Sequence, residues 1–358
     1  MNRTNNVLIV VPSFKILGGV ANHYMGLFPH WKNKVEHCFY GKRDKIPAIL
    51  CFFPDILIFI YKLIFHSVDV VIINPSLRRY QLFRDSLYLL IAIFLKKKVV
   101  TFIHGWDNQL AEKIQKKPFF FRNTYGRSLF IYVLCSDFKI KLETLKLQCP
   151  ILLTTTKVSN EILEYSNNRV RDSIKQILFL ARIEESKGIF ITLDMFKLLK
   201  AKNPNLRLVV CGTGGALEAA KSYTKREKIE DVYFKGRVSG RVLVKQFDES
   251  DIYVLPSFHE GMATSVLEAM ALGLPILSRP VGGIKDFFKN GEMGFLVSSL
   301  EAKDFADIIQ CLINDPEKVK KISQVNRIYA REHFLASRVV ENFENDLSTF
   351  LQHSKNSN

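Results

Sequence analysis

The most restrictive feature of this sequence is the alternation of short β-branched runs with apolar or amphipathic helical stretches along its whole length. Nine runs have the composition of strands, namely VLIVV, DVVII, KVVTFIH, FIYVLC, QILFLAR, LRLVVCG, VYFKGRV, DIYVLPS and PILSRP. Strands that alternate with helices are typical of parallel sheets covered by helices on both faces. The sequence therefore predicts an α/β protein of the doubly wound kind.

The length of the chain indicates two domains. Its 358 residues exceed what one hydrophobic core usually organises. The polar stretch YSNNRVRDSIKQ at 165–176 separates two series of strands and is the expected linker. We therefore predict a first Rossmann-like domain at 1–168 and a second at 169–336. Residues 337–358 are expected to form a helix that packs back on the first domain, followed by a disordered tail.

The basic charge of the chain is concentrated in its first half. Residues 1–170 contain 24 Lys and Arg against 11 Asp and Glu, whereas residues 171–358 contain 27 against 24. An anionic membrane surface, an acidic substrate or a nucleic acid could each attract such a domain. No zinc-finger spacing or aromatic RNA-binding motif accompanies the charge, so nucleic acid is not an expected partner. The sequence favours a membrane surface, with LKKK at 95–98 as its centre.

Two apolar windows in the basic half are candidate membrane segments. ILIFIYKLIF at 56–65 and SLYLLIAIFL at 86–95 are each about ten residues long, and a membrane span needs about twenty. Each window fits a helix buried against a sheet or, alternatively, a helix that lies in a membrane surface.

The cysteines and the N-terminal residues predict a cytoplasmic protein. The six cysteines have no CxxC or CxxH spacing, which favours free thiols over a disulfide framework. The short apolar run near the N-terminus breaks at Pro12 and makes a poor signal peptide. We expect a location at the inner face of the cytoplasmic membrane.

Two motifs in the first half follow predicted strands, where open α/β sheets bind ligands. Gly18 and Gly19 precede a helix and could let backbone amides approach an anion, although a simple tight turn explains them equally well. His104 and Gly105 follow the strand KVVTFI. A lone histidine is usually structural, but this position favours a ligand contact as much as a packing role.

Two further motifs lie in the second half. Arg182 and Lys187 follow one strand and suit a diphosphate, unless they are solvated surface charges balanced by neighbouring glutamates. Glu260 and Glu268 follow another strand, in FHEGMATSVLEAMALGLP. The amides between them could meet phosphate at the start of a helix. As an alternative, Ser265 and Glu268 fit the capping box S-x-x-E, in which Glu268 would stabilise the helix N-terminus instead of binding a ligand.

The order of these motifs resembles glycosyltransferase family 4. The glycine-rich turn VVCGTGG and the phrase FKGRVS add to the resemblance, which extends from about Val7 to Phe334 and is strongest in the second half. Membership would imply the GT-B fold, in which two Rossmann-like domains face each other across a cleft. The first domain would receive the acceptor and the second the nucleotide sugar.

The resemblance also implies roles for individual residues. Arg182 and Lys187 would hold the donor diphosphate, Glu268 the ribose hydroxyls, and Glu260 the transferred sugar. The remaining implied contacts are Gly18 and Gly19 with the phosphates, His104 near the reacting carbon, Val238 with the base, and the amides of Ala263, Thr264 and Ser265 with phosphate.

The family transfers sugars with retention of anomeric configuration, so the resemblance implies a retaining hexosyltransferase that acts without metal or cofactor. Its partners would be a nucleotide-diphosphate sugar and a glycan or polyprenyl-diphosphate-linked acceptor, in bacterial surface polysaccharide assembly. Two alternatives remain open at this point. One is a GT-B epimerase that acts on the nucleotide sugar alone, and the other is an inactive nucleotide-binding scaffold at the membrane.

Overall fold

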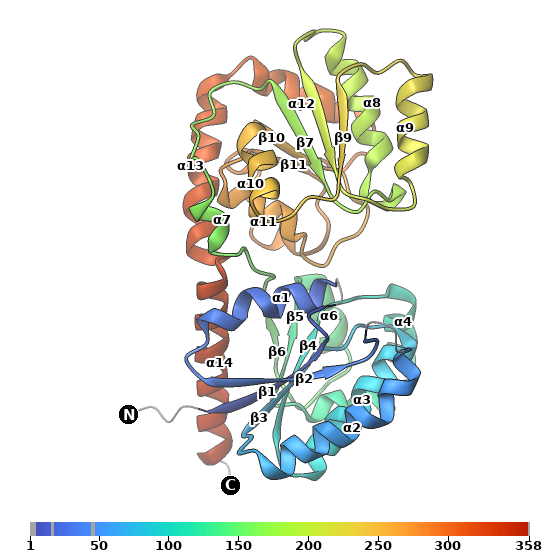
Figure 1. Cartoon of the computed structure of the whole chain (residues 1–358), viewed down its shortest axis with the longest axis vertical. Helices are drawn as coiled ribbons and strands as arrows, with labels where there is room; N and C mark the ends of the chain where they lie inside the picture. The colour runs from blue at the N-terminus through green and yellow to red at the C-terminus, as the bar shows by residue number, and fades with distance from the viewer. Residues whose placement is uncertain (1–4, 16–17, 44–46, 357–358) are drawn as a thin grey trace. The chain divides into compact units, whose positions relative to one another are not determined.

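Two six-stranded parallel sheets organise the computed structural model, which describes residues 5–15, 18–43 and 47–356. Each sheet belongs to its own unit (Figure 1). Unit 1 comprises Met1–Lys157 together with Ala336–Asn358, and unit 2 comprises Val158–Leu335. This architecture confirms the predicted doubly wound α/β fold class.

Unit 1 has the strand order β2-β1-β3-β4-β5-β6, and all of its strand pairs are parallel. Its elements are β1 (Asn6–Pro12), α1 (Gly19–Leu27), η1 (Phe28–His30), β2 (Lys34–Tyr40), α2 (Ala48–Phe65), β3 (Val70–Ile73), α3 (Arg79–Phe94), β4 (Lys98–Ile103), α4 (Asn108–Lys116), α5 (Phe119–Asn123), η2 (Tyr125–Arg127), β5 (Phe130–Val133), α6 (Ser136–Glu143), β6 (Ile151–Leu153) and α14 (Ala336–Asn356). The direction in which successive strands are added reverses beside β1, between β1 and β3.

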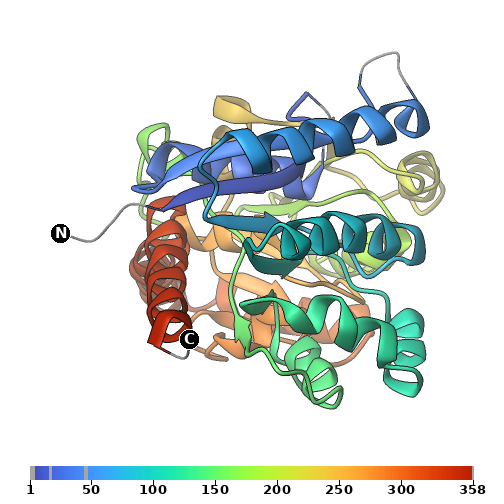
Figure 2. The same ribbon diagram turned by 90° about the horizontal axis from the view of Figure 1, so that it is seen from below.

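Helices cover both faces of the unit 1 sheet. On one face, α2 and α3 share a hydrophobic cluster with strand residues such as Val71 and Ile131. The alternate residues Phe130 and Tyr132 point to the other face, where their rings lie 5.0–5.1 Å from those of Phe350 and Phe343 on α14. The terminal helix therefore packs on the opposite side of the sheet from α2 and α3 (Figures 1 and 2).

Unit 2 has the strand order β12-β11-β10-β7-β8-β9, again with parallel pairs throughout. Its elements are α7 (Glu161–Glu164), β7 (Gln176–Leu180), η3 (Glu185–Lys187), α8 (Ile189–Lys200), β8 (Arg207–Cys211), α9 (Leu217–Arg226), β9 (Val232–Gly236), α10 (Gly240–Glu249), β10 (Ile252–Leu255), α11 (Thr264–Ala271), β11 (Ile276–Ser278), η4 (Gly282–Asp286), β12 (Gly294–Leu296), α12 (Ala302–Ile313) and α13 (Pro316–His333). This is the strand order of the dinucleotide-binding Rossmann fold, with its reversal between β7 and β10.

The stretch 165–176, expected to be the linker, lies inside unit 2. Arg171 is fully buried there, and its guanidinium donates to the carbonyl oxygens of Ser250, Phe247 and Leu272 at 2.6–3.0 Å. Three backbone acceptors compensate for the burial of the charge. A polar composition therefore does not mark a solvated segment here.

Both apolar windows of the basic half lie in helices that are longer than the windows. Helix α2 has 18 residues with Pro54 in its interior, and α3 has 16. Among the described residues, none of the helices is both long and apolar enough to cross a membrane.

Candidate functional site

The carboxyl end of the unit 2 sheet brings four sequence-predicted side chains to one edge. Arg182 and Lys187 lie in the segment after β7, and Glu260 and Glu268 lie after β10. These strands are hydrogen-bonded neighbours and flank the point where the strand order reverses. Open α/β sheets leave a crevice for ligands at this position.

Lys187 and Glu260 form an ion pair across the two loops. The Nζ of Lys187 donates to Oε1 of Glu260 at 2.6 Å, and both side chains are mostly buried. The loops are also joined through the carbonyl oxygen of Ser186, which accepts hydrogen bonds from the amide of Phe258 and the hydroxyl of Ser257. The pair therefore has a fixed backbone on both sides.

Gly188 permits this close approach of the loops. Its φ of +77° is in the left-handed region, and a methyl group there would lie 2.3 Å from the carbonyl oxygen of Pro256. Both its conformation and its contact therefore require glycine. Lys187 immediately precedes it, so the same constraint fixes the start of the lysine side chain.

Arg182 is exposed on the same edge. The neighbouring Ile183 amide donates to the carbonyl of Thr213 at 3.0 Å, which places the glycine-rich turn after β8 against this loop. The Gly212 amide donates in turn to the Gly236 carbonyl at 2.7 Å. Val238, two residues further on, is partly buried against the unit 2 core, so the predicted base contact follows the strand beside β8.

Helix α11 begins at Thr264, after an N-cap residue, Ala263, whose side chain caps nothing. Ser265 therefore lies within the helix, and its hydroxyl is 2.7 Å from the hydroxyl of Tyr253. The capping box proposed for Ser265 and Glu268 is wrong, because Ser265 does not occupy the N-cap position. The amides of residues 263–265 do lie at the helix N-terminus, as predicted.

The pKa of Tyr253 depends on the charges at this edge. Burial raises the pKa of its phenol, and the negative charges of Glu260 and Glu268 raise it further, against the hydrogen bond to Ser265. Its hydroxyl also donates to the carbonyl of Leu180 at 2.8 Å. The phenol therefore remains neutral at this edge of the sheet.

The segment η4, which the sequence motifs did not predict, also contacts the loop of Glu260. Gly282 has a φ of +61°, and a methyl group on it would lie 2.4 Å from the carbonyl oxygen of Glu260. The amide of Gly283 donates to the Gly261 carbonyl at 2.6 Å. The signal in the sequence was the pair of glycines that follows the strand PILS after three intervening residues.

In unit 1, Gly18 is the N-cap of α1 and Gly19 its first residue. Neither has a positive φ, and a methyl group on either would meet nothing within 4 Å. The tight-turn explanation therefore has no support from backbone conformation or packing. The contact of Gly18 and Gly19 with phosphate stays a prediction.

His104 directly follows β4, and a hydrogen-bond network holds its ring. Its Nε2 lies 3.1 Å from Oδ1 of Asn74, which also accepts a hydrogen bond from the hydroxyl of Tyr24 at 2.7 Å. The amide group of Asn74 donates to the carbonyl of Val10 at 3.0 Å. Because Oδ1 can only accept, Nε2 of His104 carries a proton and donates. Nδ1 then presents a lone pair.

Burial lowers the pKa of His104 well below its usual value, and the neighbouring His23 lowers it further. The two rings lie 5.2 Å apart, edge to face. Burial, together with the charge of Lys157, also lowers the pKa of His23 to about 3. Both imidazoles are therefore neutral at pH 7, and His104 is suited to accept a hydrogen bond at Nδ1.

The predicted site residues thus belong to both units. Arg182, Lys187, Val238, Glu260, Glu268 and residues 263–265 lie in unit 2, whereas Gly18, Gly19 and His104 lie in unit 1. Asn74, Tyr24 and Tyr253 were not predicted. Within the described parts of the chain, no group of three or more His, Cys, Asp or Glu side chains is arranged to hold a metal ion.

Residues 163–328 match the family model described as Glycosyl transferases group 1. This segment is a glycosyl transferases group 1 domain. It contains every site residue of unit 2 named above. The sequence resemblance to glycosyltransferases is therefore confirmed for this part of the chain.

Two curated relatives of this group 1 domain act in polysaccharide biosynthesis according to their names. The capsular polysaccharide biosynthesis glycosyltransferase CapM of Staphylococcus aureus is 28% identical over 209 residues, which cover 54% of this chain and 53% of that protein. The amylovoran biosynthesis glycosyltransferase AmsK of Erwinia amylovora is 26% identical over 226 residues, or 60% of this chain and 55% of that protein. The chain thus spans about half the length of these relatives.

Among solved structures, HepE of Anabaena, crystallised with UDP and glucose, has a TM-score of 0.72 to this chain. The sequence identity is 14%, and the superposition covers 96% of this chain and 100% of that one. The likeness extends over both units and, with the two Rossmann-like sheets, identifies the GT-B fold. The predicted fold is confirmed.

Proposed function

We propose that this protein is a retaining glycosyltransferase of family 4. It would transfer a hexose from a nucleotide-diphosphate sugar to a glycan or a polyprenyl-diphosphate-linked oligosaccharide. The observation that carries the proposal is the edge of unit 2, where Lys187 after β7 pairs with Glu260 after β10, and where Arg182 and Glu268 lie on the same two segments. A nucleotide-diphosphate sugar has a diphosphate between two hydroxyl-rich ends and suits an edge that supplies two cations and two carboxylates.

The ion pair of Lys187 and Glu260 has a role in donor binding. In the free protein, Glu260 neutralises the mostly buried ammonium group. A bound diphosphate would replace that carboxylate as the partner of Lys187, and Glu260 would then be released to accept hydrogen bonds from the sugar. Arg182, exposed on the same loop, would bind the diphosphate with two donors.

The chemistry breaks the bond between the anomeric carbon and the diphosphate oxygen and forms a bond from that carbon to an acceptor oxygen. The acceptor proton passes to the departing phosphate, which acts as the base. Arg182, Lys187 and the amides at the start of α11 would stabilise the growing charge on the diphosphate without a metal. His104, held neutral with Nδ1 as an acceptor, would bind a sugar hydroxyl near the reacting carbon.

The acceptor class rests on the relatives. The names of CapM and AmsK point to surface polysaccharides, and the complex of HepE with UDP and glucose points to a uridine or related donor. Gly18 and Gly19 would contact the donor phosphates, and Val238 the base. We place the enzyme in the cytoplasm, peripherally on the inner face of the membrane that carries lipid-linked acceptors.

Calorimetric titration of nucleoside diphosphates and their sugars tests the donor assignment. Glu268→Gln should weaken binding of free nucleotide and nucleotide sugar alike, because the ribose contact changes little during reaction. Glu260→Gln should not weaken nucleotide binding, because Glu260 leaves Lys187 when the diphosphate binds, and it should lower turnover. Glu292→Gln, an exposed change elsewhere in unit 2, is the matched control. Unchanged nucleotide affinity in Glu268→Gln would refute the ribose assignment.

A transfer assay separates the proposal from its two alternatives. A glycosyltransferase releases nucleoside diphosphate in proportion to a glycosylated acceptor, and NMR of the product should show the anomeric configuration of the donor. An epimerase would change the sugar of the donor without an acceptor, and a scaffold would bind nucleotide without turnover. Either result would overturn the proposed activity.

A further inference from the structure

The outer side of α2 carries a continuous apolar stripe. Its members recur every three or four residues, which places them on one side of a helix. They are Leu50, Phe53, Leu57, Tyr61 and Ile64, all exposed, with Phe53 at 75%. The opposite side of the helix, including Phe59 and Leu63, is buried in the unit 1 core. Helix α2 is therefore apolar on both sides, and only one side is covered.

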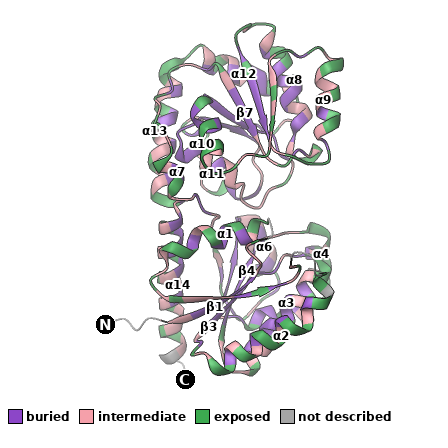
Figure 3. Ribbon diagram, viewed as in Figure 1, coloured by how far each residue is buried: buried purple, intermediate pink, exposed green. Residues whose placement is uncertain are grey.

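Helix α3 beside it repeats the pattern. Its exposed stripe consists of Tyr80, Phe83, Leu87, Leu90 and Phe94, and Phe94 is 85% exposed. Of the 25 large hydrophobic side chains that are exposed among the described residues, 12 lie on these two helices. Figure 3 shows the outer sides of both helices as exposed. We call the two stripes together the α2–α3 face. Such a concentration marks an interaction surface rather than scattered surface residues.

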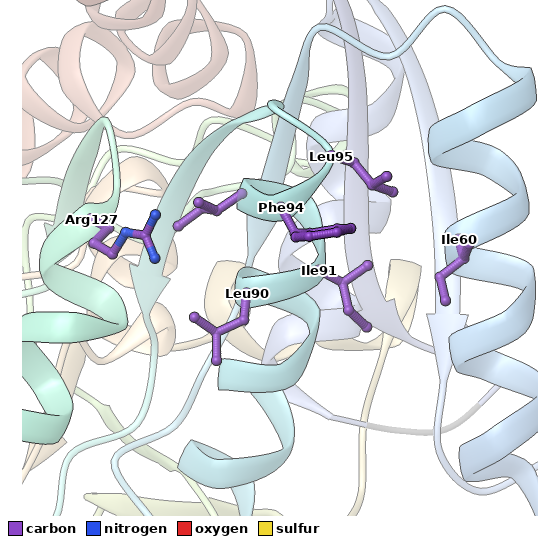
Figure 4. A pocket seen from close by; sticks show the side chains of 7 residues that line it. Ile60, Leu90, Ile91, Phe94, Leu95 and Arg127 are labelled. Carbon is purple, nitrogen blue, oxygen red and sulfur yellow. The ribbon is translucent and has the colours of Figure 1, made fainter.

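A surface cavity of about 570 Å³ lies between α2 and the end of α3 (Figure 4). It is lined by Ile60 of α2, by Leu90, Ile91, Ile93, Phe94 and Leu95 at the end of α3, and by the charged side chain of Arg127 of η2. The α2–α3 face is thus one surface with an apolar hollow and a guanidinium at the hollow. Its occupant must be apolar where it meets the stripes and anionic at Arg127.

The charges around the face are almost entirely positive. Arg78 and Arg79 lie exposed at the start of α3, and Lys96 and Lys98 lie exposed just beyond its end. Each helix carries a single carboxylate, Asp55 on α2 and Asp85 on α3, and both are buried in ion pairs with neighbouring arginines. The outer sides of α2 and α3 therefore present cations beside the apolar stripes and no carboxylate.

We propose that the α2–α3 face inserts into the interface of an anionic lipid membrane, with the stripes among the acyl chains and the flanking cations at the headgroups. Helices that lie in a membrane interface have this combination of an apolar side and lysine or arginine at headgroup level. The α2–α3 face would thus be the surface that contacts the membrane in the location proposed above.

The charge distribution disfavours a second copy of the chain as the occupant. A two-fold dimer brings the same patch of both subunits together. The cations at each end of α3 would then approach those of the partner copy with no exposed carboxylate on either helix to offset them, and like charges across an interface are unfavourable. An anionic bilayer supplies the charges that a second copy lacks.

Co-sedimentation of the full chain with vesicles tests the surface without any sugar transfer, so a failure of the proposed activity would not affect the result. The vesicles are phosphatidylcholine alone or phosphatidylcholine with 30% phosphatidylglycerol, at low and high salt. The unaltered protein should bind the anionic vesicles more strongly, and added salt should weaken that binding. Phe53→Ser with Phe94→Ser should lower the partition coefficient roughly tenfold or more.

Charge variants and controls complete the test. Lys96→Gln with Lys98→Gln should lower binding to the anionic vesicles roughly 30-fold and leave binding to neutral vesicles nearly unchanged. Val242→Ser with Ile328→Ser, two exposed apolar positions of unit 2, should have no effect. Circular dichroism checks that each variant is folded.

Three results would overturn the proposal. The first is equal binding to neutral and anionic vesicles, and the second is binding that survives both pairs of substitutions in unit 1. The third is a lipid-free dimer in analytical ultracentrifugation that Phe53→Ser with Phe94→Ser dissociates, since a second copy would then cover the α2–α3 face.

Discussion

Replacing Asn74 by leucine tests the network that holds His104, and the structure sets the size of the effect. Asn74 is 2% exposed and bonds three groups. Two of them, the Tyr24 hydroxyl and the Val10 carbonyl, are buried. Leaving either one unpaired should lower the free energy of unfolding by about 1–2 kcal/mol. The expected loss counts only these two buried groups. We expect Asn74→Leu to lower the unfolding free energy by about 2–4 kcal/mol.

Tyr24→Phe is the matched control for Asn74→Leu. It removes one hydroxyl, and Asn74 keeps its bond to His104, so the expected loss is about 1 kcal/mol. Denaturant unfolding measures both variants. Nitrogen-15 NMR of the histidine rings should show His104 as the Nε2–H tautomer in the parent protein and in Tyr24→Phe, but as a tautomer mixture in Asn74→Leu. Equal stability losses in the two variants, or an Nδ1–H tautomer in the parent protein, would refute the reasoning.

Three further predictions concern the site and its supports. Arg182→Ala and Lys187→Ala should each raise the activation free energy at saturating donor by about 3 kcal/mol and so lower turnover roughly a hundredfold, because charge on the departing diphosphate grows in the transition state. Near-normal turnover would exclude them from the diphosphate site. Gly188→Ala should destabilise the protein in thermal unfolding by at least 1–2 kcal/mol more than Gly291→Ala, since Gly291 also has a positive φ but no atom within 4 Å of an added methyl group. The pKa of His23 is about 3 in the folded protein, so below pH 6.5 the unfolded chain binds one more proton at this residue. The unfolding free energy should therefore fall by about 2 kcal/mol between pH 6.5 and 5 because of His23. His23→Gln should remove this part of the pH dependence.

The sequence was sufficient for the fold class because nine of the twelve described strands coincide with short β-branched runs between helices. The runs did not include β2, β6 or β12. It was insufficient for the segment 165–176, whose polar composition indicated a linker. Arg171 is buried there because three carbonyl oxygens from two other segments accept its hydrogen bonds. Those acceptors are 76–101 residues away in the chain, so no local pattern could reveal them.

The same limit explains which site residues were missed. Arg182, Lys187 and Glu260 were predicted because they lie in short motifs that follow strands. Asn74 also follows a strand directly, but its importance depends on β3 lying between β1 and β4. Only that strand order brings it to His104. The window 86–95 of α3 left burial and exposure open for a related reason, because apolar residues on both sides of a helix give no sign of which side is covered.

The position of Glu268 in an otherwise apolar helix follows from the geometry of α11. Residues 266, 267 and 269–271 of this helix are buried, whereas Thr264, Ser265 and Glu268 are partly exposed. Positions three and four residues apart share one side of a helix, so these three form its polar side. The N-cap is Ala263, which makes Glu268 the fifth residue of the helix and places it outside the capping-box position at N3. Its charge acts on Tyr253 together with that of Glu260, so both carboxylates lie at the edge where β10 ends. We therefore propose that a ligand bound at that edge, rather than a capping box, accounts for the carboxylate on this side of α11.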